Sequence, residues 1–335
     1  MLRSLKPSII FSIFLLFSCS PYSLPEFEDK PPREDAFTYY QESIQNYNAG
    51  NYKKALENIQ KALRINQNFA NFYKKEGDIY NQLAEYNQAL ESYEKAINQR
   101  SNFIEVHQKM AEIYCKQDNY EQAVRSYRKV LVLEPRETEM YLKIAQCYIA
   151  MDELEIALNN LNDYVNNEKN YSRDYYLLKG ITYYNLRRYS DVIEELGQFE
   201  DQGETNTDIL YLLGRSYYGI KNYEKGLTCF NKLIQRDPSH GEYFYYRGIY
   251  FYVRENYEDA EMQFKYALEL DRSLAMAHYY LGKIYSIRWE VEKALSEFSL
   301  FQDSKKDSEH REEIDTLTSQ LQQLRVLVSD STHNP

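Results

Sequence analysis

The sequence predicts an all-α protein in which helix–turn–helix units of one design stack into a solenoid. A small residue recurs eight times at intervals of 34 or 35 residues, and apolar residues follow it at fixed helical spacings. Glycine and proline, at 11 and 8 in 335 residues, are scarce for a β-rich chain. Since one unit cannot bury its apolar face alone, neighbouring units must supply a continuous core.

The composition excludes several function classes. The net charge of −11, with no basic stripe, argues against a nucleic-acid partner. The cysteines at 19, 115, 147 and 229 have neither CxxC nor metal-ligand spacing, so they imply no disulfide framework and no metal site. The sequence shows no nucleophile–base pair, convergent carboxylate pair or phosphate loop, so we expect neither a cofactor nor catalysis.

Residues 1–18 are predicted to be a signal sequence. Arg3 and Lys6 precede twelve mostly apolar residues, a run too short to span a bilayer. The run "LFSC" (16–19) resembles the lipobox of bacterial lipoproteins, in which the cysteine is lipidated and becomes the first mature residue. That resemblance implies a lipid on Cys19 and anchoring in a bacterial envelope, with the outer membrane favoured. The alternative is an ordinary signal peptide that happens to contain a cysteine.

Residues 19–35 form the next predicted segment. It contains four prolines and has no helical periodicity, so we expect a tether between the lipidated Cys19 and the folded domain.

The repeated array is predicted over residues 36–303. The small residue of each unit, numbered zero below, is Ser43, Gly77, Ala111, Ala145, Gly180, Gly214, Gly248 or Gly282. At +12 stand small or β-branched residues: Ala55, Ala89, Ala123, Ala157, Val192, Gly226, Ala260 and Ala294. At +16 stand aliphatic or aromatic residues: Ile59, Tyr93, Tyr127, Leu161, Leu196, Phe230, Phe264 and Phe298. Polar, turn-prone pairs at +7 and +8 predict a turn between two helices that approach closely at the small residues.

This register resembles the tetratricopeptide repeat (TPR), with its 34-residue period and its small and aromatic positions. The resemblance implies a right-handed α-solenoid of about eight units. Two departures stand out. Only Pro135 and Pro238 occupy the place of the proline that often closes a repeat, and the fifth unit is irregular, with an internal Gly197 and a polar run after Phe199.

A C-terminal helix is predicted over residues 304–328. Ile314, Leu317, Leu321, Leu324 and Val328 alternate by three and four and form one apolar stripe. A capping helix that covers the end of the solenoid is the favoured interpretation, and a dimeric coiled coil is the alternative. A monomer is therefore favoured, and residues 329–335 are expected to be loose.

The TPR resemblance implies that partners bind on the concave surface, which is lined by the first helix of each unit. Positions −6, −3, +1 and +4 share one face of that helix. In the fifth to eighth repeats the predicted groove residues are Leu177, Ile181, Tyr184, Tyr211, Arg215, Tyr218, Tyr245, Ile249, Tyr252 and Tyr279. In the second and third repeats the same positions are polar.

An acidic residue stands at −6 in each of the third to seventh repeats. This acidic rail consists of Glu105, Glu139, Asp174, Asp208 and Glu242. The acids suit either partner recognition or the positive end of a helix dipole, and both roles are expected. Lys74, Arg215 and Lys283 lie in distant units, so the clamp of several cations that holds an acidic peptide end in chaperone-binding TPR domains is not expected.

The resemblance therefore implies a lipid-anchored scaffold or adaptor in the bacterial envelope, with other proteins or peptides as partners. The alternative within this class is a regulatory or assembly subunit of an envelope enzyme or secretion complex, similar to a pilotin or a hydrolase adaptor.

Overall fold

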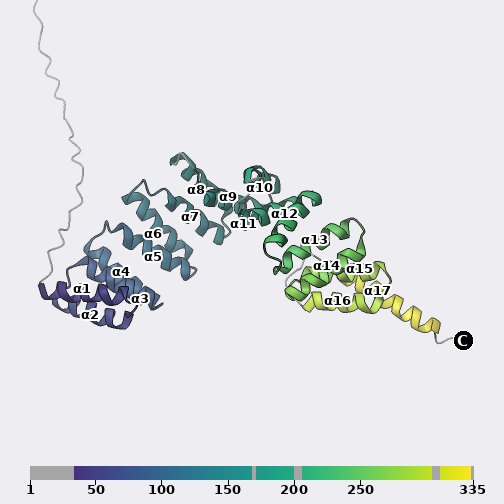
Figure 1. The fold of residues 1–335 in the computed structure, drawn as a ribbon, viewed down its shortest axis with the longest axis horizontal. Helices are drawn as coiled ribbons and strands as arrows, with labels where there is room; N and C mark the ends of the chain where they lie inside the picture. The colour runs from purple at the N-terminus through teal and green to yellow at the C-terminus, as the bar shows by residue number, and fades with distance from the viewer. Residues whose placement is uncertain (1–33, 168–170, 200–205, 304–309, 333–335) are drawn as a thin grey trace, which may run out of the picture. The chain divides into compact units, whose positions relative to one another are not determined.

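The computed structural model describes residues 34–167, 171–199, 206–303 and 310–332. Every regular element in these ranges is a helix (Figure 1), which confirms the predicted all-α fold. The chain divides into two compact units, residues 1–113 and 114–335, and the division falls within α5. The predicted signal sequence and the tether up to residue 33 lie outside the described residues.

Unit 1 holds two helix pairs and most of a fifth helix. Its elements are α1 (Glu34–Asn48), α2 (Tyr52–Ile65), α3 (Ala70–Gln82), α4 (Tyr86–Gln99) and α5 (Ile104–Lys116). Buried residues from α1, α2 and α3, among them Ile59, Phe72 and Ile79, form one core cluster in this unit. Each pair therefore buries its apolar face against the next, as the repeat pattern predicts.

Unit 2 continues the same succession of pairs. Its helices are α6 (Tyr120–Leu133), α7 (Glu139–Ala150), α8 (Leu154–Asn167), α9 (Arg173–Asn185), α10 (Tyr189–Leu196), α11 (Thr207–Gly219), α12 (Tyr223–Arg236), α13 (Gly241–Val253), α14 (Tyr257–Leu270), α15 (Ala275–Ile287), α16 (Val291–Asp303) and α17 (Arg311–Thr332). In the irregular fifth repeat α10 has only eight residues, and the short 3-10 helix Gly197–Phe199 follows it.

One turn geometry connects the two helices of every repeat. The +7 residue has φ between 55° and 61° in seven repeats, and Gly50 has φ 76° in the first. The next N–H donates to the carbonyl five residues earlier, as from Asn256 to Phe251 at 3.0 Å, which closes the first helix with a Schellman-type bond. The Asn256 side chain then accepts from the N–H of Asp259 at 3.4 Å and caps the second helix.

The glycines at position zero lie against the +16 side chain of their own repeat. A Cβ added to Gly77 would come within 2.5 Å of the Tyr93 ring, and one added to Gly248 within 2.6 Å of the Phe264 ring. The +12 residues are buried in all eight repeats. The two helices of each repeat therefore meet where the periodicity predicts.

Aromatic stacking joins successive repeats in the C-terminal part of unit 2. The Tyr246 ring stacks on Phe230 with 4.4 Å between centroids and 8° between planes, and Tyr280 stacks on Phe264 at 5.2 Å and 9°. In both cases a residue at −2 covers the +16 residue of the preceding repeat. Such contacts carry the nearest-neighbour coupling on which a solenoid depends.

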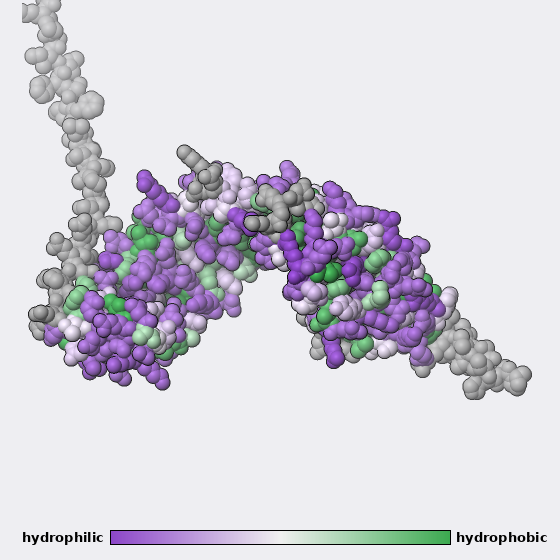
Figure 2. All heavy atoms as spheres, viewed as in Figure 1, coloured by the Kyte–Doolittle hydropathy of each residue, from purple (hydrophilic) through white to green (hydrophobic). Residues whose placement is uncertain are grey.

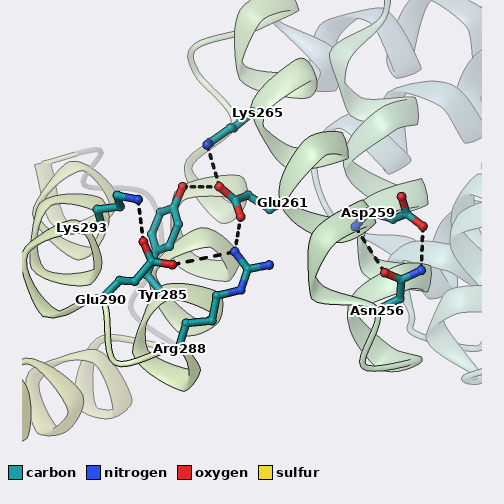
Figure 3. Close-up of polar contacts among 8 residues, drawn as sticks. All are labelled: Asn256, Asp259, Glu261, Lys265, Tyr285, Arg288, Glu290 and Lys293. Atoms are coloured by element: carbon teal, nitrogen blue, oxygen red, sulfur yellow. Dashed lines mark hydrogen bonds and ion pairs between the residues drawn. The ribbon is translucent and has the colours of Figure 1, made fainter.

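A polar network also joins α14 to the following helix pair (Figure 3). The Glu261 carboxylate accepts from Lys265 at 2.6 Å, from the Tyr285 hydroxyl at 2.8 Å and from Arg288. Arg288 lies 3.9 Å from Glu290, which pairs with Lys293 at 2.5 Å. These three donors lower the pKa of Glu261 to about 2, even though desolvation opposes the shift.

Helix α17 packs against the last repeat. Ile314 and Leu321 are buried in the same core cluster as α15 and α16, and Leu317 packs against that cluster. The side chains of Leu324 and Val328 lie outside the described set. The helix ends at Thr332, four residues beyond the predicted boundary at 328.

Candidate partner-binding groove

Three polar residues at predicted groove positions of unit 1, Lys74, Asp78 and Glu105, form ion pairs with one another. The buried carboxylate of Asp78 accepts a hydrogen bond from the Tyr93 hydroxyl at 2.8 Å. Lys74, Lys75 and Lys109 lie 3.3, 3.7 and 3.5 Å from the same carboxylate. This arrangement satisfies the buried charge locally.

Lys74 also pairs with Glu105 of the acidic rail at 2.7 Å. Within unit 1, therefore, the predicted groove positions hold a self-contained ion-pair cluster. Its cations Lys74, Lys75 and Lys109 are already paired with acidic side chains of the same cluster.

Unit 2 has a cavity between α7 and α9 on the predicted groove face. Its volume is about 420 Å³. The residues lining it are Glu139, Leu142, Lys143, Gln146, Ser172, Asp174, Leu177, Leu178 and Ile181. Four aliphatic side chains form an apolar lining, while the exposed Glu139, Asp174 and Lys143 supply charges of both signs. The structure thus brings together two predicted groove residues, Leu177 and Ile181, and two members of the acidic rail.

An arginine–tyrosine cluster lies further along the same face, at α9 and α11. The Arg215 guanidinium carbon is 4.7 Å from the centroid of Tyr184 and 5.3 Å from that of Tyr211. Arg215 Nη1 donates to the Tyr211 hydroxyl at 3.3 Å. Within the described ranges no carboxylate lies at ion-pair distance from Arg215, and its Nε has no hydrogen-bond partner.

Burial governs the electrostatics of this cluster. Desolvation raises the pKa of Tyr184, and it raises that of Tyr211 with a further contribution from the Glu242 carboxylate. Both phenols therefore stay neutral at physiological pH. The cation lies against the negative faces of two neutral rings, an arrangement that favours cation–π attraction.

Tyr218 does not project into the groove, contrary to the prediction. It is 9% exposed, its hydroxyl donates to the Tyr246 carbonyl at 2.6 Å, and its ring packs on Phe230. The reason is Gly226, which stands at +12 where seven repeats carry a larger residue. A Cβ there would lie 2.4 Å from the Tyr218 ring, so the glycine makes room for the ring inside the repeat.

Two further predicted groove residues are also buried. Ile249 is 9% exposed and belongs to the core of unit 2. Tyr279 is 4% exposed because α17 covers it: its hydroxyl donates to Glu313 at 2.8 Å, and its ring stacks on His310 with 4.7 Å between centroids. Desolvation and the Glu313 carboxylate raise the pKa of Tyr279 to about 12. Lys283 pairs with Glu313 at 2.9 Å, so α17 closes the groove at the last repeat.

Tyr245 and Tyr252 remain half-buried. Their rings lie against Tyr280, with centroid distances of 6.1 and 5.0 Å. Both tyrosines pack against the core of unit 2 and keep part of their surface outside it.

The five acids of the rail each lie in the first turn of their helix, from α5 to α13. This position favours negative charge beside the helix dipole, as one of the two interpretations predicts. Only Glu139 and Asp174 also line the cavity.

Residues at −2 were missed by the sequence reasoning. Lys143 and Leu178 line the cavity from this position, and Tyr246 supplies the stacking described above. The signal was present, since the −2 series changes from Lys75, Lys109 and Lys143 to Leu178, Leu212, Tyr246 and Tyr280. The predicted groove face consists of positions −6, −3, +1 and +4. Position −2 lies beside this face, so its residues were not included.

The surface seen in Figure 2 is mostly hydrophilic, with hydrophobic residues in small separate areas. Within the described ranges, no group of three or more histidine, cysteine or acidic residues could hold a metal ion. The same part of the chain contains no helix long and apolar enough to cross a membrane.

Comparison with known proteins agrees with this architecture. A family model described as soluble NSF attachment protein, SNAP, matches residues 28–212, and a tetratricopeptide repeat model matches residues 211–275. No curated protein matches the chain.

Solved structures of similar fold include a tetratricopeptide repeat protein from Parabacteroides merdae. It is 16% identical with a TM-score of 0.55, and the alignment covers 75% of this chain and 99% of that one. The Cut9–Hcn1 hetero-tetramer of the APC/C includes a chain that is 13% identical with a TM-score of 0.55, covering 81% of this chain and 52% of that one. At these identities the likeness shows the fold alone.

Proposed function

Because the chain belongs to the TPR/SNAP-like repeat family, we propose that it is a lipid-anchored scaffold that binds a segment of a partner protein in the groove of unit 2. TPR folds generally serve as non-catalytic interaction scaffolds. The observation that carries the proposal is the cavity between α7 and α9, with its aliphatic lining and its charged rim. It is an open site on the face where the family's first helices line the groove.

The cavity suits one apolar side chain of an extended partner segment. Leu142, Leu177 and Ile181 would bury that side chain, while Glu139 and Asp174 would attract a basic residue beside it. One turn after Ile181, Tyr184 begins the arginine–tyrosine cluster, whose rings and guanidinium offer a surface on which planar peptide groups can stack. The proposed ligand is therefore an extended segment with an apolar anchor and a neighbouring basic residue.

Anchoring is the second part of the proposal. A lipid on Cys19 would hold the array at a membrane of the bacterial envelope, with the outer membrane favoured, and residues 19–35 would be the tether. The lipobox-like sequence around Cys19 supports this part.

Within this function the chain acts without catalysis of its own. It could serve as a general adaptor, or as a regulatory or assembly subunit, similar to a pilotin or a hydrolase adaptor, of an envelope enzyme or secretion complex. Both roles place the partner segment in the same groove.

A capture experiment tests the proposal. The Leu177→Arg variant places a charge in the apolar lining, and Val132→Arg is the matched control because Val132 is 72% exposed on α6, away from the cavity lining. Crosslinking capture from native bacterial membranes should lose specific partners with Leu177→Arg and retain them with Val132→Arg. Equal capture by both variants would contradict the groove assignment.

A further inference from the structure

Two cysteine thiols within residues 114–335, the range of unit 2, lie in contact. Cys115 is in the last turn of α5 and Cys147 is in α7, and their Sγ atoms are 3.6 Å apart. The sequence spacing of 32 residues gave no sign of this pair, because it equals neither the repeat period nor any motif spacing. The stacking of successive repeats brings the two thiols together.

From this geometry we propose that Cys115 and Cys147 form a dithiol site that closes to an intramolecular disulfide when it meets a small-molecule disulfide. A disulfide bond is about 2.05 Å long, so the sulfur atoms must approach by roughly 1.5 Å to form it. The bond would tie the end of α5 to α7, the helix that carries Leu142, Lys143 and Gln146 of the cavity wall.

The exposure of the two thiols decides which of them reacts first with the small disulfide. Cys115 is half-buried, whereas Cys147 is 3% exposed, so the external disulfide reaches Cys115 first. The hydrogen bond with Cys115, followed by burial, raises the pKa of Cys147, which disfavours its thiolate until the neighbour has reacted.

The reaction balances as two exchanges. The Cys115 thiolate attacks one sulfur of the small disulfide, forms a mixed disulfide and releases one thiolate. The Cys147 thiolate then attacks the Cys115 sulfur, forms the protein disulfide and releases the second thiolate. The two protons lost by the protein thiols end on the two released thiols, and the small disulfide is the oxidant.

The chain contains its own control for this chemistry. Cys229 is fully buried in the core of unit 2, so the small disulfide does not reach it. The experiment uses the full chain with Cys19→Ala, so that three cysteines remain.

This protein is incubated with oxidised glutathione, and thiols are then counted under denaturing conditions. The proposal predicts a fall from three thiols to one, a monomer on a non-reducing gel, and a single crosslinked peptide that contains Cys115 and Cys147. The thermal midpoint should rise and return to its first value after dithiothreitol.

Two variants separate the steps. Cys147→Ser should stop at a stable glutathione adduct on Cys115, and Cys115→Ser should retain both of its thiols. Three thiols left in the parent protein, a glutathione adduct that persists on its Cys115, or crosslinking only between molecules would overturn the proposal. None of these outcomes depends on partner binding, so the groove proposal is tested separately.

Discussion

The ring of Tyr218 occupies the space that a side chain on Gly226 would need: an added Cβ would lie 2.4 Å from Tyr218 Cδ2. We expect Gly226→Ala to displace this ring and to lower the free energy of unfolding by about 1–3 kcal/mol. Denaturant unfolding followed by circular dichroism measures this change. Gly197→Ala is the control, because nothing lies within 4 Å of its Cβ position and its φ is −59°. Equal stability of the two variants would contradict the packing described here.

Tyr184 and Tyr218 should respond oppositely to truncation. Tyr184 is half-buried beside Arg215, so Tyr184→Ala should weaken partner capture by about 1–3 kcal/mol with a small effect on stability. Tyr218 is a core residue, so Tyr218→Ala should cost about 3 kcal/mol of unfolding free energy. Partner capture and thermal unfolding, measured on both variants, test these expectations. A large loss of binding by Tyr218→Ala at unchanged stability would restore the original prediction that Tyr218 faces the groove.

The Glu261 network should make stability depend on acid pH. Because the folded-state pKa is about 2, below the value of roughly 4.3 in an unfolded chain, the carboxylate stabilises the fold fully above the unfolded value. That contribution is lost as the pH falls through about 2. Glu261→Gln should therefore be less stable than the parent at pH 7, by on the order of 1–3 kcal/mol, and the difference should shrink between about pH 4 and 2.

Thermal melts across that pH range provide the test. Glu269→Gln on the exposed side of α14 is the control and should follow the parent at every pH. A difference between Glu261→Gln and the parent that stays constant with pH would show that the ion pairs do not cause it.

The proposed lipid anchor on Cys19 is tested by substitution. Cys19→Ala should leave the precursor unprocessed or release a soluble protein, since the thiol proposed to carry the lipid is absent. Detergent-phase partitioning and metabolic labelling with a fatty acid measure the effect. Partitioning and processing like those of the parent would exclude the lipoprotein assignment.

Much of the fold could be predicted from the sequence because eight copies report the same packing. The contact of Gly248 with Phe264 recurs in all five repeats that carry glycine at position zero, so its spacing is a strong signal. The exposure of single groove residues could not be predicted this way. Tyr218 is buried because one repeat has glycine at +12, and Tyr279 is buried because α17 lies over it.

The candidate site was predicted in part for a related reason. Leu177 and Ile181 follow the helical face and do line a cavity, whereas Lys143 and Leu178 line it from the edge of that face. The contact of Cys115 with Cys147 depends on how successive repeats stack, and the spacing of one chain segment does not contain that information.

Site-specific photocrosslinking from the cavity tests the central claim most directly. A photoreactive amino acid replaces Gln146, which lines the cavity and is exposed, and in a matched protein it replaces Val132 on α6. After irradiation in native membranes, mass spectrometry identifies the attached peptides. The account predicts one recurring partner segment, with an apolar residue beside a basic one, attached at position 146 and absent at position 132. Attachment of the same segment at position 132 and not at position 146 would contradict it.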